Sequence, residues 1–194
     1  MTSGQATEPS TSSALGISRQ FMLSTGESLH DASFQHPIAL VFLRHFGCTF
    51  TRQILMGLEE LRRQADQHGA RLVLVHMLRQ GDELRYLAGN SGVARIADPD
   101  CRLYRAFGLG RGGFFELFGP RVIWLGMVSV FKGCGVGHLA GDGLQMPGAF
   151  VFHRGAVTVA RKARTAADLP DLSDLLVGHS ADLPSPNNPS KCAP

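Results

Sequence analysis

The chain has 194 residues, 44% of them hydrophobic, and a formal net charge of +3 from 19 basic and 16 acidic side chains. This length and hydrophobic content predict one globular domain with its own core and exclude two large ones. The small basic excess is spread along the sequence, which argues against a nucleic-acid-binding protein.

Neither end of the chain is predicted to pack. Residues 1–17 are rich in Ser and Thr and lack the basic and apolar regions of a secretory signal, so we expect a disordered leader. Residues 178–194 are rich in Pro, Ser and Asn and are expected to be a disordered tail. The longest apolar run, Val122 to Phe131, is about half of the roughly 20 residues that a membrane span needs. No contact with a membrane is therefore expected.

The first half of the domain contains the pattern of a β-α-β unit. A turn at Ser24-Thr25-Gly26, flanked by Gln20–Leu23 and Glu27–Leu29, indicates a short hairpin or strand pair at the edge of a sheet. The continuous apolar run Ile38–Leu43 is typical of a central strand that is covered on both faces. Apolar residues at helical spacing predict a helix over Thr51–His68, which ends at Gly69. The apolar run Arg71–His76 predicts a second buried strand.

The second half continues with shorter elements and an insertion. The pattern predicts, in order, a short helix within Gly81–Gly92, a strand at Val93–Ala97, a helix at Cys101–Phe107, an insertion over 109–145, a hairpin of Ala149–Phe152 with Ala156–Ala160, and a helix at Thr165–Leu176. This order predicts an α/β fold over residues 18–177, with a central mixed sheet flanked by helices. An aromatic cluster in the insertion is either a partner or homodimer surface or ordinary core filling; it comprises Phe114, Phe115, Phe118 and Trp124.

A single cysteine stands where the first buried strand gives way to the first long helix. The segment IALVFLRHFGCTFT, residues 38–51, places Cys48 at or just before the N-terminus of that helix. The unpaired N–H groups of a helix N-terminus favour an anion, and the thiolate is the nucleophilic form of cysteine. We therefore predict a reactive thiol at Cys48, the alternative being a cysteine that only fills the core.

Three segments together resemble a known family. They are FLRHFGCTFT with the helix that follows it, ADPDCRLYRAFGL, and GDGLQMPGAFVFHRG. They resemble the thioredoxin superfamily, in particular its AhpC/TSA peroxiredoxin-like branch and the group with an FxRHFxCxxC-type motif. The resemblance covers roughly residues 18 to 176 and implies a thioredoxin-like fold with a redox-active thiol at Cys48.

The motif around Cys48 departs from both well-known forms of the superfamily. Where peroxiredoxins carry Pro and Thr or Ser ahead of the attacking cysteine, this chain has Val41 and His45. Thr51 occupies the position of the second cysteine of a C-x-x-C site. A single-thiol site must complete its cycle with a distant resolving cysteine or with an external thiol such as glutathione.

The neighbours of Cys48 have alternative roles. Arg44 is expected to stabilise the thiolate by its charge. His45 is either a general base or a packed side chain, and Thr51 either donates a hydrogen bond to the thiolate or caps the helix.

Two further cysteines are candidate resolving residues. Cys134 lies in a glycine-rich segment and is the better candidate. Cys101 lies between acidic neighbours, Asp98 and Asp100, and like-signed charge disfavours a thiolate there.

The resemblance also predicts a substrate groove. Pro147 fits the position at which thioredoxins carry a cis proline opposite the active cysteine, so Met146 and Pro147 are expected to line that groove. The pair Cys134 and His138 has metal-like spacing but no second ligand pair, so no metal is predicted. The Gly108, Gly110 and Gly113 pattern follows a helix rather than a strand, so no dinucleotide cofactor is predicted either.

The function predicted from these residues is that of a peroxiredoxin-like antioxidant enzyme that reduces peroxides through Cys48. Its partners would be a peroxide or disulfide substrate and a reducing thiol, either glutathione or a thioredoxin-type protein. Two alternatives stay open: a monothiol, glutaredoxin-like reductase, and a thioredoxin-fold interaction module without catalysis. Four cysteines without disulfide spacing favour the cytoplasm.

Overall fold

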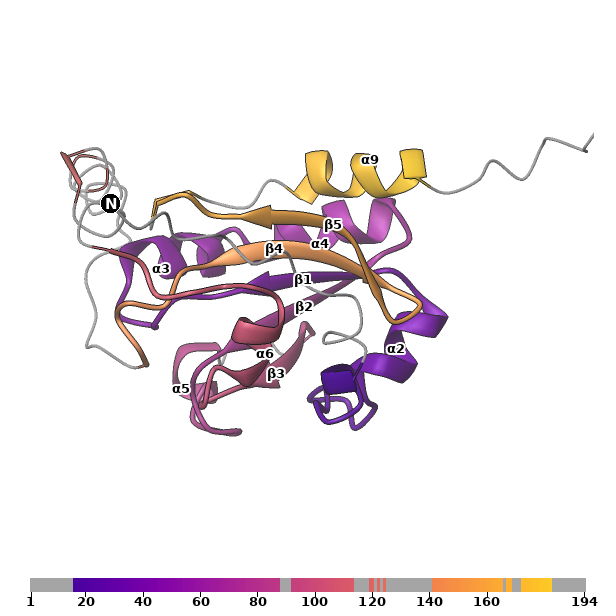
Figure 1. The fold of residues 1–194 in the computed structure, drawn as a ribbon, viewed down its shortest axis with the longest axis horizontal. Coiled ribbons are helices and arrows are strands. Elements are labelled where there is room, and N and C mark those ends of the chain that lie inside the picture. Colours follow the sequence, from indigo (N-terminus) through magenta and orange to yellow (C-terminus); the bar gives the residue numbers. More distant parts are fainter. Residues whose placement is uncertain are drawn as a thin grey trace, which may run out of the picture.

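The computed structural model describes residues 16–87, 92–113, 119, 120, 122, 124, 141–165, 167, 168 and 172–182, the last three of these as backbone only. Its elements are α2 (Leu29–Gln35), β1 (Ile38–Phe42), α3 (Thr49–Met56), α4 (Leu58–Gln67), β2 (Arg71–His76), α5 (Leu84–Leu87), β3 (Ala94–Ala97), α6 (Arg102–Ala106), β4 (Gly148–His153), β5 (Ala156–Lys162) and α9 (Leu172–Asp182). The five strands form one sheet in the order β3-β2-β1-β4-β5 (Figure 1).

β1 is the central strand, as its sequence of five apolar residues predicts. It pairs in parallel with β2 and antiparallel with β4, and every one of its residues is buried. Because successive side chains of a strand point to opposite faces, Leu40 and Phe42 enter one core layer while Ala39 and Val41 enter the other. β1 thus supplies both halves of the core, and its C-terminal end leads into the loop that carries Cys48.

Helices cover both faces of the sheet. α4 and α9 pack on one face, while α2 and α6 contribute buried residues to the other (Figure 1). The strand β4 runs antiparallel to β1, whereas β2 and β3 run parallel to it, so the sheet is mixed. The predicted α/β, thioredoxin-like fold with a mixed sheet between helices is therefore confirmed.

Two elements in the N-terminal half of the chain differ from the sequence prediction. The single helix predicted over Thr51–His68 is broken at Gly57, which ends α3 and precedes α4. Glycine in a helix interior gains no side-chain contacts and costs conformational entropy, which explains the break at this residue. The predicted strand pair around Gly26 is reduced to one bridge between Met22 and Ser28, because Ser28 caps α2 through a hydrogen bond from the Asp31 N–H at 3.0 Å.

The C-terminal helix is also shifted. The predicted helix at Thr165–Leu176 begins only at Leu172 and continues to Asp182, so Gly178 lies inside α9 and the predicted tail boundary at 178 is wrong. The Asp168 carboxylate accepts hydrogen bonds from the N–H groups of Arg164 and Thr165, at 2.7 and 3.0 Å, and this turn takes the place of the first helical turns. The remainder of the predicted tail lies outside the described residues, as does the predicted leader up to residue 15.

The two ends of the predicted insertion meet at its base. Arg111 pairs with Gln145 in an isolated bridge, and the Gly112 N–H donates to the Leu144 carbonyl at 2.8 Å. Cys134 and the phenylalanines of the predicted aromatic cluster lie outside the described residues, while Trp124 is exposed. In the part of the chain that the structure describes, no helix is long and apolar enough to cross a membrane.

Candidate functional site

Cys48 occupies the N-cap position of α3, immediately after the loop that leaves β1. Its N–H donates to the His45 carbonyl at 2.9 Å, and its own carbonyl accepts from the Arg52 N–H at 3.1 Å. The residue is buried, at 7% exposure, and its thiol is free. The strand-to-helix turn predicted from the sequence therefore exists, and the sulfur lies at the end of the helix where the backbone favours an anion.

Arg44 brings a positive charge directly to that sulfur. Its Nη1 donates to the Cys48 Sγ at 3.2 Å, while its Nε and Nη2 donate to the backbone carbonyls of Gln145 and Gly143, at 3.3 and 2.6 Å. The side chain is itself buried at 7% exposure. A guanidinium that is fixed at two carbonyls and remains charged at any ordinary pH stabilises a neighbouring thiolate.

Gln145 secures the segment that holds Arg44. Its buried Nε2 donates to the carbonyls of Leu109 and Gly110, at 3.2 and 3.0 Å. The antiparallel pairing of Phe42 with Gly148 brings this segment beside Arg44. Sequence reasoning missed Gln145, and the only signal it offered was a polar residue directly ahead of the predicted Met146-Pro147 groove.

His45 is a neutral side chain at physiological pH. Burial and the nearby Arg44 charge lower the pKa of its imidazole from 6.5 to about 4, although Asp142 acts in the opposite direction. Its Nδ1 is buried and has no hydrogen-bond partner among the described residues. The structure shows the His45 backbone bound to Cys48 but gives no hydrogen bond from its imidazole to the thiol.

Thr51 lies in the first turn of α3 and is almost completely buried. Its Oγ1 finds no hydrogen-bond partner in the described part of the chain, so it neither caps the helix nor donates to the Cys48 sulfur. The N-cap position belongs to Cys48, which makes no side-chain capping bond. The hydroxyl is consequently a buried donor whose acceptor is missing.

Cys101 is separated from Cys48 in the fold. It precedes α6 in a left-handed conformation, φ 52°, and packs in the core layer that contains Tyr104 and Phe107. Burial, followed by the charges of Asp98 and Asp142, raises the pKa of the Cys101 thiol. The structure thus pairs neither of the two described cysteines, and both are free.

Met146 shares a small apolar cluster with Cys48. The cluster also contains Phe50, Val122 and Ala167. The expectation of a cis bond before Pro147 is wrong, because no cis peptide bond occurs among the described residues. The antiparallel pairing of β1 with β4 is sufficient to bring Met146 to the level of the Cys48 loop.

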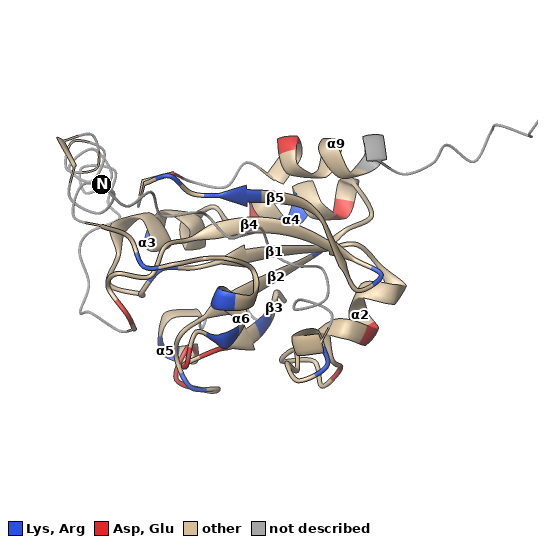
Figure 2. Ribbon diagram, viewed as in Figure 1, with Lys and Arg blue, Asp and Glu red and all other residues tan. Residues whose placement is uncertain are grey.

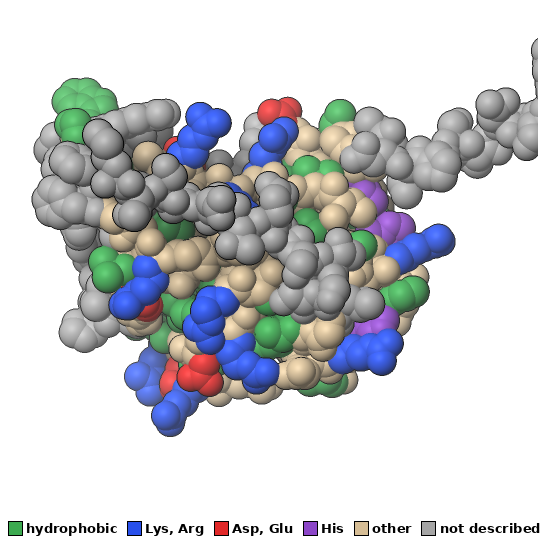
Figure 3. Space-filling view, viewed as in Figure 1, with side chains coloured by type: hydrophobic (Ala, Val, Ile, Leu, Met, Phe, Trp, Pro, Cys, Tyr) green, Lys and Arg blue, Asp and Glu red, His purple; other side chains and the backbone are tan. Residues whose placement is uncertain are grey.

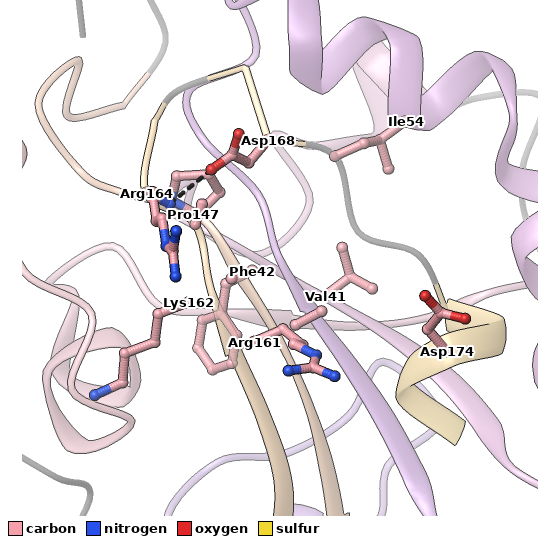
Figure 4. Close-up of a pocket in the computed structure, with 12 residues that line it drawn as sticks. Val41, Phe42, Ile54, Pro147, Arg161, Lys162, Arg164, Asp168 and Asp174 are labelled. Carbon is pink, nitrogen blue, oxygen red and sulfur yellow. Dashed lines mark hydrogen bonds between the residues drawn. The ribbon is translucent and has the colours of Figure 1, made fainter. Parts of the chain in front are cut away.

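Pro147 lines a groove of about 270 Å³ (Figure 4). Its lining also includes the apolar residues Val41, Ile54 and Ala149 and the basic residues Arg161, Lys162 and Arg164. β5 ends in Arg161 and Lys162, and its C-terminal end is accordingly blue in the charge view (Figure 2). Over the visible surface as a whole, basic side chains are distributed in several separate places (Figure 3).

A match between the sequence and the profile of a protein family shows the family of the chain. The profile of the AhpC/TSA antioxidant enzyme family matches residues 57–165, which is more than half of the chain. The chain belongs to this family. Since the matched segment begins at Gly57, the role of Cys48 in this AhpC/TSA protein rests on the geometry of the site itself.

Solved peroxiredoxins share the fold of this AhpC/TSA protein. Peroxiredoxin Q of Xanthomonas campestris aligns with a TM-score of 0.55 at 18% identity, over 86% of this chain and 94% of its own. A cysteine-to-serine mutant of peroxiredoxin 6 from Arenicola marina aligns with a TM-score of 0.56 at 17% identity, over 83% of this chain and 68% of its own. Peroxidoxin BcpB of Mycobacterium tuberculosis aligns with a TM-score of 0.51 at 13% identity, over 84% of this chain and 92% of its own. No curated protein matches the chain in sequence.

Proposed function

We propose that this AhpC/TSA protein is a thiol-dependent peroxidase in which Cys48 attacks the peroxide. The observation that carries the proposal is the 3.2 Å hydrogen bond from the Arg44 Nη1 to the Cys48 Sγ, made by a guanidinium that two backbone carbonyls fix in place. Family membership supplies the antioxidant chemistry, and this contact supplies the activated nucleophile.

The proposed reaction oxidises Cys48 and reduces the peroxide. The thiolate sulfur attacks one oxygen of the O–O bond, that bond breaks, and its other oxygen leaves as an alcohol or water after it takes up a proton. Cys48 becomes a sulfenic acid. Arg44 stabilises the thiolate before the attack, and its positive charge also favours the negative charge that develops on the departing oxygen.

Thr51 and His45 have secondary roles in this proposal. The Thr51 hydroxyl, in the first turn of α3 and without a partner among the described residues, is a further candidate donor to a bound peroxide oxygen. His45, whose pKa is lowered to about 4 by burial and by Arg44, stays neutral and supplies no positive charge to the site. Neither residue needs to act for the Arg44 contact to activate Cys48.

We further propose that an external thiol completes the cycle. That thiol attacks the sulfenic sulfur and releases water, and a second thiol then reduces the mixed disulfide to regenerate Cys48. Cys101 packs in a different core cluster from Cys48, and its raised pKa disfavours the thiolate form. Glutathione or a thioredoxin-type protein in the cytoplasm is the proposed reductant, and Cys134 is the alternative within the chain.

The proposal is tested by treating the reduced protein with one equivalent of peroxide and measuring its intact mass. We expect the addition of one oxygen atom, trapped by a sulfenic-acid reagent, in the wild type and in Cys101→Ser. We expect no rapid addition in Cys48→Ser. Failure of the wild type to react, together with ready exchange of a glutathione adduct at Cys48, would contradict a peroxidase and indicate a monothiol reductase.

A further inference from the structure

A second cavity, of about 240 Å³, lies away from Cys48 at the β3 edge of the sheet. Its walls come from the N-terminal segment around Phe21 and Met22, from the ends of β2 and β3, and from Glu83 ahead of α5. None of its lining residues belongs to the cluster around Cys48. The cavity is therefore a separate site.

Two opposite charges face this cavity from buried side chains. Arg95 and Glu83 are only 12% and 5% exposed, and the Arg95 Nε lies 3.8 Å from the Glu83 Oε1, which is close enough for attraction but too long for a hydrogen bond. The Arg95 Nε and Nη1 are buried and have no acceptor among the described residues. Acidic and basic residues are correspondingly mixed around α5 and β3 in Figure 2.

His76 adds an unused acceptor to the same cavity. It is 1% exposed, and its Nδ1 has no partner among the described residues. Burial and the Arg95 charge lower the pKa of its imidazole, although Glu83 and a hydrogen bond to the Leu78 backbone act in the opposite direction. A neutral imidazole has one nitrogen that accepts a hydrogen bond, and the unpartnered Nδ1 is free to take this role toward a ligand.

Buried donors and acceptors without partners destabilise a fold unless a ligand or water satisfies them. Two such groups lie here, the Arg95 guanidinium and the His76 Nδ1. They lie beside Glu83, whose Oε2 accepts a hydrogen bond from the Gly81 N–H at 2.6 Å and whose Oε1 is 3.8 Å from the Arg95 Nε. A simple anion would add a second negative charge beside Glu83 and leave the His76 Nδ1 without a donor, and a simple cation would leave Arg95 unmatched. A ligand that carries both charges on neighbouring atoms satisfies all three.

We propose that this cavity binds a free α-amino acid as its zwitterion. The carboxylate accepts hydrogen bonds from the Arg95 Nε and Nη1, and the ammonium group donates to the Glu83 carboxylate and to the His76 Nδ1. The side chain of the amino acid lies against Phe21 and Met22. The volume, below that of typical cavities for drug-sized ligands, suits a molecule of this size.

The test uses the dialysed full-length protein and three matched probes in calorimetric and thermal-shift titrations. The probes are leucine, isovalerate, which has the carboxylate without the amine, and isoamylamine, which has the amine without the carboxylate. We expect only leucine to raise the midpoint of thermal unfolding and to give a measurable binding isotherm. Equal effects of isovalerate would indicate a plain anion site, and no effect of any probe would indicate a cavity filled by water; either result overturns the proposal.

Variants then assign the binding to the cavity. We expect Arg95→Gln to weaken leucine binding by at least about tenfold, because a charged hydrogen-bond pair is lost. Arg71→Gln is the matched control, since Arg71 is also paired with a glutamate, Glu27, but does not line the cavity. If Arg95→Gln does not fold, the wild type still decides: leucine must shift the His76 Nδ1 resonance in protein with nitrogen-labelled histidine, and an unchanged resonance overturns the proposal.

Discussion

At the scale of single residues, the site depends on how Arg44 is held. Its three hydrogen bonds fix the guanidinium against the Cys48 sulfur and leave the side chain almost no conformational freedom. A flexible surface arginine at the same distance would be screened by water and would stabilise a thiolate weakly. Because the whole contact is buried, a single arginine is sufficient to stabilise the thiolate.

Removal of this charge should slow the reactions of Cys48. A hydrogen bond to a charged group is worth about 1.5–3 kcal/mol, so we expect Arg44→Met to slow alkylation of Cys48 at pH 7 by at least about tenfold. Arg44→Lys should fall between the wild type and Arg44→Met, because lysine keeps the charge but loses the fixed geometry. Exposed Arg62→Met is the control, and equal rates in all variants would refute the role of Arg44.

His45 should make the protein less stable in mild acid. Its pKa is lowered to about 4 in the folded state by burial and by Arg44, so below pH 6.5 the unfolded chain binds a proton that the folded chain excludes. Stability is therefore lost as the pH falls from about 6.5 to about 4. Between pH 7 and pH 5 we expect His45→Gln to lose about 1–2 kcal/mol less than the wild type, a range that allows for the partial exposure of the ring.

Urea unfolding at the two pH values measures this difference. The substitution His68→Gln, at an exposed position, is the control. This variant should lose as much stability between pH 7 and pH 5 as the wild type does. His76, whose pKa is also lowered, contributes loss of the same sign in every variant. An unchanged loss in His45→Gln would show that the His45 imidazole is not held neutral in the folded protein.

Among the secondary-structure elements, α6 joins the ends of the parallel strands β1 and β2 through hydrogen bonds. The buried Tyr104 hydroxyl lies 2.6 Å from the Leu43 carbonyl and 2.9 Å from the Val75 carbonyl, and its single proton is shared between these acceptors. Asp98 positions the helix, since its carboxylate accepts hydrogen bonds from the N–H groups of Arg102 and Leu103 at 2.8 and 2.7 Å. Leu43 directly precedes Arg44, so this helix also supports the site.

Tyr104→Phe should therefore destabilise the fold. We expect a loss of about 1–2 kcal/mol, because the substitution leaves the buried Leu43 carbonyl without this donor. Urea unfolding measures the loss. Tyr86→Phe is the matched control, since Tyr86 is partly exposed and stacks on Phe46 at 4.7 Å. Equal stability of the two variants would show that the Tyr104 hydroxyl contributes nothing.

For the molecule as a whole, the order of the strands predicts that the centre of the sheet is its most stable part. β1 is fully buried between β2 and β4, whereas β5 is an edge strand with several exposed residues. In native-state hydrogen exchange we expect the amides of β1 to exchange only through global unfolding. Those of β5 that do not bond to β4 should exchange faster. Exchange of β1 through local openings would contradict this order of stability.

The fold class and the position of Cys48 could both be read from the amino-acid sequence. Strand β1, strand β2 and the start of the helix after Cys48 are encoded in local patterns of apolar residues, so they could be predicted without tertiary information. The break of that helix at Gly57 and the start of α9 at Leu172 could not, because turns and packing outweigh intrinsic helix preference at such positions.

The groups that surround the Cys48 sulfur depend on contacts between distant parts of the chain. Arg44 was predicted to matter by its charge, but its anchors lie at Gly143 and Gln145, and Gln145 is 101 residues away along the chain. No local pattern encodes a contact between such distant segments, because it arises from the antiparallel packing of β4 against β1. The cavity at Arg95, Glu83 and His76 has the same origin, since three unremarkable positions become a charged and buried site only when β2, β3 and the segment before α5 come together.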